Sequence, residues 1–316
     1  MNSIAKRVKA RIKTIPGMGP LSVSLWRLIK DFKKTYKNVR EELAASSHNI
    51  KQNRQEAEPA RNYSELTIEQ IQQAMDKWYA EGNAYKHEKL WDKIRLEERN
   101  NRCLALISPT DGKRILEIGC GIRGITPYIS TCAEYVGIDL SKEAISKATR
   151  QFSGKPGFSF AVMDAQDLKF PDCSFDIIVA QEVIEHLPCI ERAFGEIYRV
   201  LRPGGQVVIT SPNRNSLHLR VNRMLGYKDF TCSFDHIKEL TFEEAEKMLL
   251  EVGLKITHTS GTFLKPYWGI PGIDEHVRHL TDNDPTMVDM LKELGQLCGP
   301  KFAFCYVIKG EKPNNR

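Results

Sequence analysis

The sequence predicts an α/β fold built on a mostly parallel, doubly wound sheet, and three observations lead to it. Apolar runs of strand length alternate with helical patterns between residues 109 and 310, as in a parallel sheet covered by helices. The first run, 114–118, breaks into a glycine-rich turn at 119–124. The second run ends on an acid, Asp139. Because ligands of open α/β sheets bind beyond the carboxyl ends of the strands, these features predict a binding site there.

The elements follow in order along the chain. Seven segments have the apolar composition of strands: 114–118, 135–139, 158–162, 175–180, 206–210, 254–259 and 301–309. Helix starts are indicated at Ser141 and by a capping box at Thr241 and Glu244, with Gly253 at that helix's end.

Two connections, 213–240 and 263–300, are longer than a minimal fold needs. The second contains a helical pattern at 285–298. Long ordered insertions are typically lids or binding loops. We therefore expect the first of them, which leaves the carboxyl edge of the sheet, to shape a substrate pocket.

The segments around this core divide the rest of the chain. A basic amphipathic arm is predicted at 1–43, a polar linker at 44–62, a helical cap at 63–108 and a short tail at 311–316. Within the cap, Thr67 and Gln70 fit a capping box. The core is thus expected to span 109–310.

The 316 residues have a net charge of +6, but it is unevenly placed. Residues 1–40 hold eleven Lys or Arg and one acid, whereas the remainder is slightly acidic. A basic amphipathic segment favours an anionic membrane surface as its partner, and packing on the body or on a partner protein is the alternative. Nucleic acid is disfavoured as a partner, because the arm lacks interleaved aromatic residues and has no known RNA module.

Eight cysteines occur without a C-x-x-C pair, and one of them, Cys120, lies inside the glycine turn. This pattern favours reduced thiols and a cytoplasmic location, at the membrane's cytoplasmic face if the arm binds lipid. We find no run of transmembrane length and no secretory signal.

Glu117, two residues before the first glycine, favours a cationic ligand. A carboxylate there would repel a pyrophosphate but would suit S-adenosylmethionine (SAM). Asp139, 22 residues later, is placed to accept hydrogen bonds from two ribose hydroxyls, and capping the following helix is its alternative role. For Glu117, capping the glycine turn is the alternative.

In this order of motifs the chain resembles the class I SAM-dependent methyltransferases, especially the branch with ubiquinone- and menaquinone-pathway enzymes. The resemblance implies a Rossmann-like sheet whose seventh strand runs antiparallel between the fifth and the sixth. One departure is that Arg123 stands at the family's third glycine position, with Gly124 one residue late. The resemblance implies cofactor contacts at Glu117, Gly119, Cys120, Gly121, Asp139, Leu140, Asp164, Ala165 and Gln181.

His186, just past the fourth strand, is the first candidate for a catalytic base, and His236 in the 213–240 insertion is the second. Organising the loop is the alternative role of His186. Glu182, Glu185 and His186 also permit a divalent metal site, which His236 could complete. This pattern is similar to that of metal-binding ubiquinone-pathway O-methyltransferases and small-RNA 2′-O-methyltransferases. The same residue pattern also occurs in methyltransferases that bind no metal.

These features predict methyl transfer from SAM to oxygen or carbon of a small or lipid-like acceptor, such as a quinone-type phenol, a lipid or a lipid-linked intermediate. A metal-assisted RNA 2′-O-methyltransferase is the enzymatic alternative. A non-catalytic SAM-binding or membrane-adaptor protein is the third hypothesis. Since this fold serves many acceptors, the resemblance does not identify one.

Overall fold

The computed structural model describes residues 66–82, 89–228, 230–233, 235–265, 267–270 and 273–314. The predicted arm at 1–43 and linker at 44–62 lie outside the described residues. The chain divides into two compact units, Met1–Pro59 and Ala60–Arg316, and everything described below belongs to the second.

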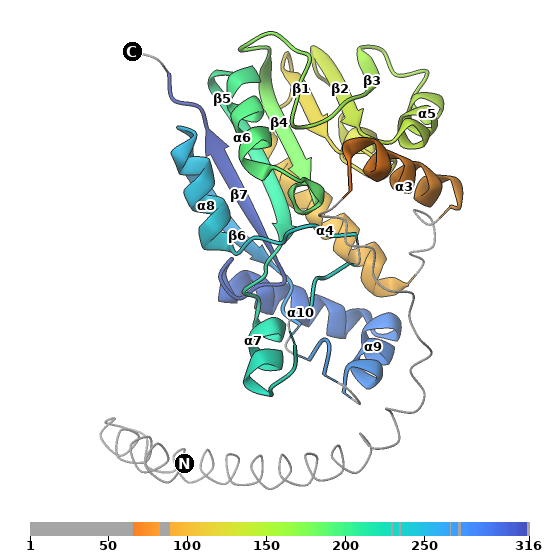
Figure 1. Cartoon of the computed structure of the whole chain (residues 1–316), viewed down its shortest axis with the longest axis vertical. Helices are drawn as coiled ribbons and strands as arrows, with labels where there is room; N and C mark the ends of the chain where they lie inside the picture. The colour runs from red at the N-terminus through yellow and green to blue at the C-terminus, as the bar shows by residue number, and fades with distance from the viewer. Residues whose placement is uncertain are drawn as a thin grey trace, which may run out of the picture. The chain divides into compact units, whose positions relative to one another are not determined.

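Seven strands form one sheet in the order β3-β2-β1-β4-β5-β7-β6 (Figure 1). The strands are β1 (Arg114–Ile118), β2 (Glu134–Asp139), β3 (Phe158–Val162), β4 (Phe175–Gln181), β5 (Leu201–Pro212), β6 (Lys255–Thr262) and β7 (Cys305–Glu311). Neighbours among the first five pair in parallel, whereas β7 runs antiparallel to both β5 and β6. The predicted mostly parallel Rossmann-like sheet is confirmed.

Both faces of the sheet are buried, which explains why its central strands are apolar throughout. In β1, Leu116 and Ile118 face one core while Ile115 faces the other. The first core includes Phe194 of helix α6 and Leu249 of helix α8, and the second includes residues of helix α4. Figure 1 shows α6 and α8 on one side of the sheet and α4 on the other.

Three helices begin where capping residues predict. Helix α3 starts after the Thr67–Gln70 capping box, α5 after Ser141, and α8 after the Thr241–Glu244 capping box. The helices are α3 (Ile68–Ala80), α4 (Leu90–Ile107), α5 (Lys142–Gln151), α6 (Ile190–Val200), α7 (Leu217–Met224), α8 (Phe242–Glu251), α9 (Asp274–Asn283) and α10 (Pro285–Cys298), with 3₁₀ turns η3 (Thr126–Tyr128) and η4 (Ile184–His186).

Some boundaries differ from those the sequence indicates. Helices α7 and α9 lie in the two insertions and were not expected, because their patterns are short and polar. Strand β7 begins at Cys305 instead of residue 301, since residues 301–304 form turns after Gly299, whose φ is +70°. None of the helices in the described ranges is both long and apolar enough to cross a membrane.

The candidate site lies at the centre of the sheet, where the carboxyl ends of β1 and β4 meet. Strand β1 pairs with β2 on one side and β4 on the other, so the direction of chain progression reverses between β1 and β4. Such a switch point opens a crevice at the carboxyl ends of the strands. The glycine turn leaves β1 there, and η4 follows β4.

Candidate functional site

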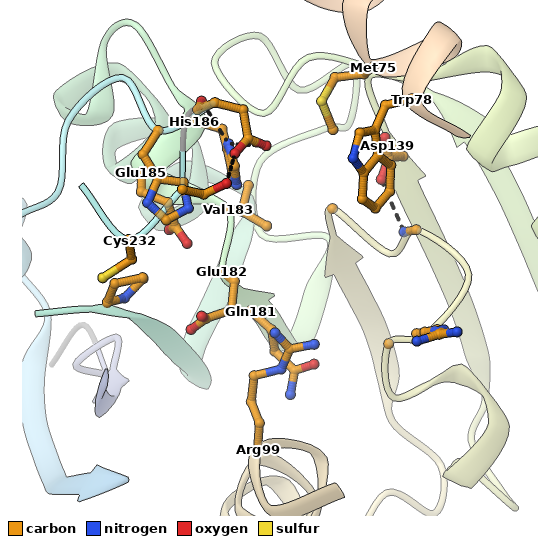
Figure 2. A pocket seen from close by; sticks show the side chains of 18 of the residues that line it. Met75, Trp78, Arg99, Asp139, Gln181, Glu182, Val183, Glu185, His186 and Cys232 are labelled. Carbon is orange, nitrogen blue, oxygen red and sulfur yellow. Dashed lines mark hydrogen bonds and ion pairs between the residues drawn. The ribbon is translucent and has the colours of Figure 1, made fainter. Parts of the chain in front are cut away.

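One cavity of about 690 Å³ lies at this switch point. Its walls come from α3, α4, the glycine turn, the ends of β2 and β4, and both insertions. In Figure 2, Met75, Trp78 and Asp139 stand on one side of it and Glu185, His186 and Cys232 on the other. Its volume falls within the range of about 300–1,000 Å³ that is typical of small-molecule sites.

The glycine turn is held tightly against its neighbours. Gly121 has φ +47°, and a Cβ added there would lie 2.7 Å from the Tyr79 hydroxyl of α3. At Gly124 an added Cβ would lie 2.0 Å from Glu117 Oε1. The glycine one residue later than the family pattern is therefore required, because the turn passes directly over the Glu117 carboxylate.

Glu117 lies beneath the turn, where it is buried and does not line the cavity. Its Oε1 accepts a hydrogen bond of 2.8 Å from the Ile125 N–H, and its Oε2 accepts bonds from the hydroxyls of Thr126 and Tyr135. Burial raises the pKa of Glu117, and these hydrogen bonds oppose the shift. The geometry supports the turn-capping alternative, while direct contact with a cofactor stays a prediction.

Asp139 is fixed at the end of β2 by two backbone donors. Its Oδ2 accepts from the Gly121 N–H at 3.0 Å and its Oδ1 from the Ser141 N–H at 2.9 Å. Burial raises the pKa of this carboxyl to about 6, so it is mostly ionised at neutral pH. Each carboxylate oxygen can accept a second bond. A ribose diol fits this preorganised pair of acceptors.

Helix α3 of the cap is fastened to the same strand end. Gln72 Nε2 donates to the Leu140 carbonyl at 2.7 Å, and Asp76 Oδ1 accepts from the Ser141 hydroxyl at 2.7 Å. Trp78 and Tyr79 thereby come to line the cavity. The sequence predicts a cap, but it does not identify Asp76 as its fastening.

The other predicted cofactor residues also lie at the cavity. Gly119, Cys120, Leu140, Asp164, Ala165 and Gln181 all line it. Asp164 is held by the Gln166 N–H, which donates to its Oδ1 at 2.8 Å. The contacts that these residues make with a bound cofactor stay predictions.

Gln181 and Arg99 contain buried polar atoms that have no hydrogen-bond partner in the described part of the chain. They are both amide atoms of Gln181 and Nε of Arg99. Both residues line the cavity, and Figure 2 shows Arg99 rising from α4 toward the end of β4. Because a buried polar atom without a partner costs about 1–3 kcal/mol, these atoms indicate a polar ligand group. The carboxylate and ammonium of an amino acid, as in the methionyl part of SAM, would satisfy them.

Sequence reasoning did not find Arg99. It is one of several charged residues in the middle of α4, and its approach to β4 depends on how that helix packs. The signal would have been an arginine in the helix directly before the first strand.

Glu185, His186 and His236 form a cluster on the opposite side of the cavity. One potential ligand atom from each lies within 4.8 Å of the others. His186 Nδ1 lies 3.2 Å from the Asp235 carbonyl oxygen, and His236 Nδ1 lies 2.6 Å from Glu239 Oε1. The two candidate bases from separate segments are therefore neighbours, with ring centroids 4.9 Å apart.

Burial has different effects on the pKa values in this cluster. It lowers the pKa of His186, which favours the neutral imidazole that a base requires. Burial also lowers the pKa of His236, but the bond to Glu239 and the charge of Glu185 outweigh it and the net shift is upward. Burial and the nearby Glu182 charge raise the pKa of Glu185, and the charge of His236 opposes the shift.

Glu182, the fourth metal candidate, is not part of this cluster. Its backbone has φ +54°, and its side chain meets Arg95 Nη1 at 3.5 Å and the Thr210 hydroxyl at 3.1 Å. The i, i+3, i+4 convergence assumed a regular helix, whereas Ile184–His186 is a 3₁₀ turn after a left-handed residue.

Three aromatic side chains that line the cavity lie close to one lysine. Trp91 of α4, Trp268 of the second insertion and Phe304 before β7 line the cavity together with Lys265. The first insertion adds Cys232 and His236, as expected for a segment that shapes a substrate pocket. The involvement of Trp268 and Lys265 was not predicted, because the sequence left the side of the second insertion open.

Comparison with known proteins agrees with this geometry. Residues 116–209 match the family model described as "Methyltransferase domain". The chain is 38% identical over 152 residues to phthiotriol/phenolphthiotriol dimycocerosates methyltransferase 1 of Mycobacterium ulcerans, covering 47% of this chain and 53% of the relative.

Two further relatives cover similar regions. Fatty-acid O-methyltransferase of Mycolicibacterium smegmatis is 39% identical over 103 residues, or 32% of this chain and 37% of the relative. Sterol 24-C-methyltransferase of Pneumocystis carinii is 32% identical over 190 residues, or 54% and 49%. The chain thus spans about half or less of the length of these relatives.

Among solved structures, the fold is similar to a Haloferax volcanii methyltransferase determined with the Trm112 methyltransferase activator. The TM-score is 0.56 at 18% identity, and the match covers 78% of this chain and 99% of that one.

Proposed function

We propose that this chain, which carries a class I SAM-dependent methyltransferase domain, methylates oxygen or carbon of a lipid-like acceptor. The observation behind this proposal is the single cavity that joins the Asp139 and glycine-turn region to an aromatic pocket. A shared cavity lets the methyl donor and the acceptor meet without water between them.

Different residues of the chain would bind different parts of SAM. Asp139 would hold the ribose of SAM, and Arg99 and Gln181 would hold its amino-acid end. When bound, SAM supplies an electrophilic methyl group on a sulfonium sulfur. Helix α3 covers this end of the cavity through Trp78 and Tyr79, which would exclude water from it.

His186 is the proposed base for an acceptor that must lose a proton. Its pKa is lowered by burial, so Nε2 is available as an acceptor at neutral pH while Nδ1 lies toward Asp235. The proton of a phenol or alcohol would pass to this ring nitrogen as the acceptor oxygen forms its bond to the methyl carbon. The bond from that carbon to the sulfur of SAM would break in the same step, leaving S-adenosylhomocysteine. An acceptor that is already an anion would not need this step.

The lipid-like acceptor is supported by two findings. Trp91, Trp268 and Phe304 line the cavity, and three relatives are named for lipid, fatty-acid or sterol substrates. These relatives differ in the atom methylated, so oxygen and carbon both remain within the proposal.

A label-transfer assay tests this function. The full chain is incubated with methyl-labelled SAM and a cell extract, and the products are separated into organic-soluble, aqueous and macromolecular fractions. Label in the organic fraction, absent with D139A, is the expected result. Label confined to RNA, or none at all, would contradict the proposal.

Peripheral attachment to an anionic membrane is a further part of the proposal, and it rests on the basic amphipathic sequence of residues 1–40. Each Lys or Arg near such a surface contributes about 1 kcal/mol. Flotation with vesicles that contain phosphatidylserine should recover the wild-type chain. Reversal of Lys30, Lys33, Lys34 and Lys37 to Glu should abolish flotation and leave binding of S-adenosylhomocysteine (SAH) intact.

A metal-assisted reaction is the second candidate, favoured by the gathering of Glu185, His186 and His236. Two imidazoles and a carboxylate are suitable ligands for a divalent ion. If this candidate is correct, a chelator should abolish label transfer, and E185Q should abolish it equally. Full activity after chelation would leave His186 as a metal-free base.

A further inference from the structure

Lys265 occupies an unusual position at the aromatic end of the cavity. Its Nζ lies 3.6 Å from the ring centroid of Trp91, 5.1 Å from that of Trp268 and 5.3 Å from that of Phe304. These three rings come from α4, the second insertion and the segment before β7. The ammonium group thus lies among three aromatic rings in the wall of the cavity.

The other cations near it have carboxylate partners. Arg95 Nη1 meets Glu182 at 3.5 Å, Lys89 Nζ meets Asp282 at 2.9 Å, and Arg278 makes two bonds of 2.9 Å to Asp274. None of the ion pairs formed among the described residues includes Lys265. Cation–π contacts compensate only part of the lost hydration of an ammonium.

The charged groups near Lys265 do not stabilise its ammonium form. Burial and the nearby charges together lower the pKa of Lys265 to about 7. Burial is the largest cause, and Arg95 and Arg278 lower the pKa more than Asp92 and Asp274 raise it. The neighbouring His218 imidazole is itself buried with a lowered pKa and adds no negative charge. A ligand that brings one negative charge next to Nζ would supply the carboxylate partner that Lys265 lacks among the described residues.

We propose that Lys265 is the counter-ion for a carboxylate on the acceptor, which makes the acceptor an acidic lipid. The aromatic walls fit an apolar chain, and a single unpaired ammonium fits a monovalent acid better than a phosphate, which several donors normally surround. The identification of this ligand as the methyl acceptor rests on the function proposed above, whereas the binding site itself does not. Lys265 is then a specificity-determining residue.

The test compares two probes of equal chain length, dodecanoate and dodecan-1-ol. Binding to the full chain, saturated with SAH, is followed by tryptophan fluorescence, since Trp91 and Trp268 flank Lys265. Wild-type protein should bind dodecanoate about tenfold more tightly than the alcohol, as expected for one charge-assisted hydrogen bond. This preference should disappear in K265M and persist in K265R.

K255M, which removes an exposed lysine in β6, is the matched control and should behave as wild type. Unchanged SAH affinity in K265M establishes that the variant is folded. Equal binding of both probes by wild type, or a carboxylate preference that survives in K265M, would overturn the inference. If the wild-type chain neither binds SAH nor transfers label, the proposed function is refuted instead. Failure of the Lys265 inference and failure of the proposed function are therefore distinguishable.

Discussion

The carboxylate of Asp76 accepts a hydrogen bond of 2.7 Å from the hydroxyl of Ser141, which connects the cap helix to the end of the second strand. The same Oδ1 accepts the Glu143 N–H at 3.0 Å. Ser141 also receives the Ala144 N–H as an N-cap, and its own N–H donates to Asp139. One acid in the cap thus positions the turn that holds the proposed ribose acceptor.

Replacement of Asp76 by Ala should therefore weaken SAH binding, although Asp76 does not line the cavity. Loss of hydrogen bonds to a charged acceptor costs about 1.5–3 kcal/mol, and we expect part of that cost to appear as a roughly threefold to tenfold higher Kd. Calorimetric titration with SAH measures it. D289A, at an exposed acid of α10, is the control, and equal affinities in the two variants would refute the coupling.

Two ligands can distinguish the proposed roles of Asp139 and Arg99. D139A should weaken binding of both SAH and 5′-methylthioadenosine about tenfold or more, because both contain the ribose. R99A should weaken SAH by a similar factor and leave methylthioadenosine unaffected, since that molecule lacks the amino-acid end. R150A, at an exposed arginine of α5, should change neither. An R99A variant that loses both ligands equally would argue against the assignment.

The affinity for SAH should depend on the ionisation of Asp139. Burial raises its pKa to about 6, so the carboxylate is lost as the pH falls through that value. We expect constant affinity above pH 7 and a progressive loss below pH 6, absent in D139N. Titrations between pH 5 and 8 test this, and a flat wild-type profile would contradict it.

His186 should affect the rate rather than cofactor binding. H186N should lower kcat by about 10²–10⁴-fold if the imidazole is the general base, with an unchanged Kd for SAH. H258N, at an exposed histidine of β6, should retain full activity. If H186N remains active, the histidine only organises the loop, or the acceptor already reacts as an anion.

The charge of Lys265 should reduce the stability of the folded protein. Its folded pKa of about 7 lies below the ordinary lysine value of 10.5, so the unfolded chain binds more protons between these values and stability rises with pH. K265M should therefore have a higher Tm than wild type, by about 2–4 °C for each kcal/mol recovered. Scanning calorimetry should show a larger difference at pH 6 than at pH 9, and a pH-independent difference would exclude titration of Lys265.

The sequence alone determined where the strands lie along the chain, the glycine turn and the position of Asp139. Each of these depends on local physics: strand-length apolar runs, glycines where the backbone turns tightly, and an acid at a strand end. The capping residues Thr67, Ser141 and Thr241 act within one helical turn, so their positions were predictable as well.

Only the tertiary structure decided which distant residues meet. Asp76 and Ser141 are 65 residues apart, and the His186 and His236 rings come together only because the first insertion folds back over η4. Arg99 and Lys265 face the cavity because α4 and the second insertion pack there, which no local pattern encodes. The chemistry of a site depends on burial and on proximity between segments, and both arise only when the sheet and its insertions assemble.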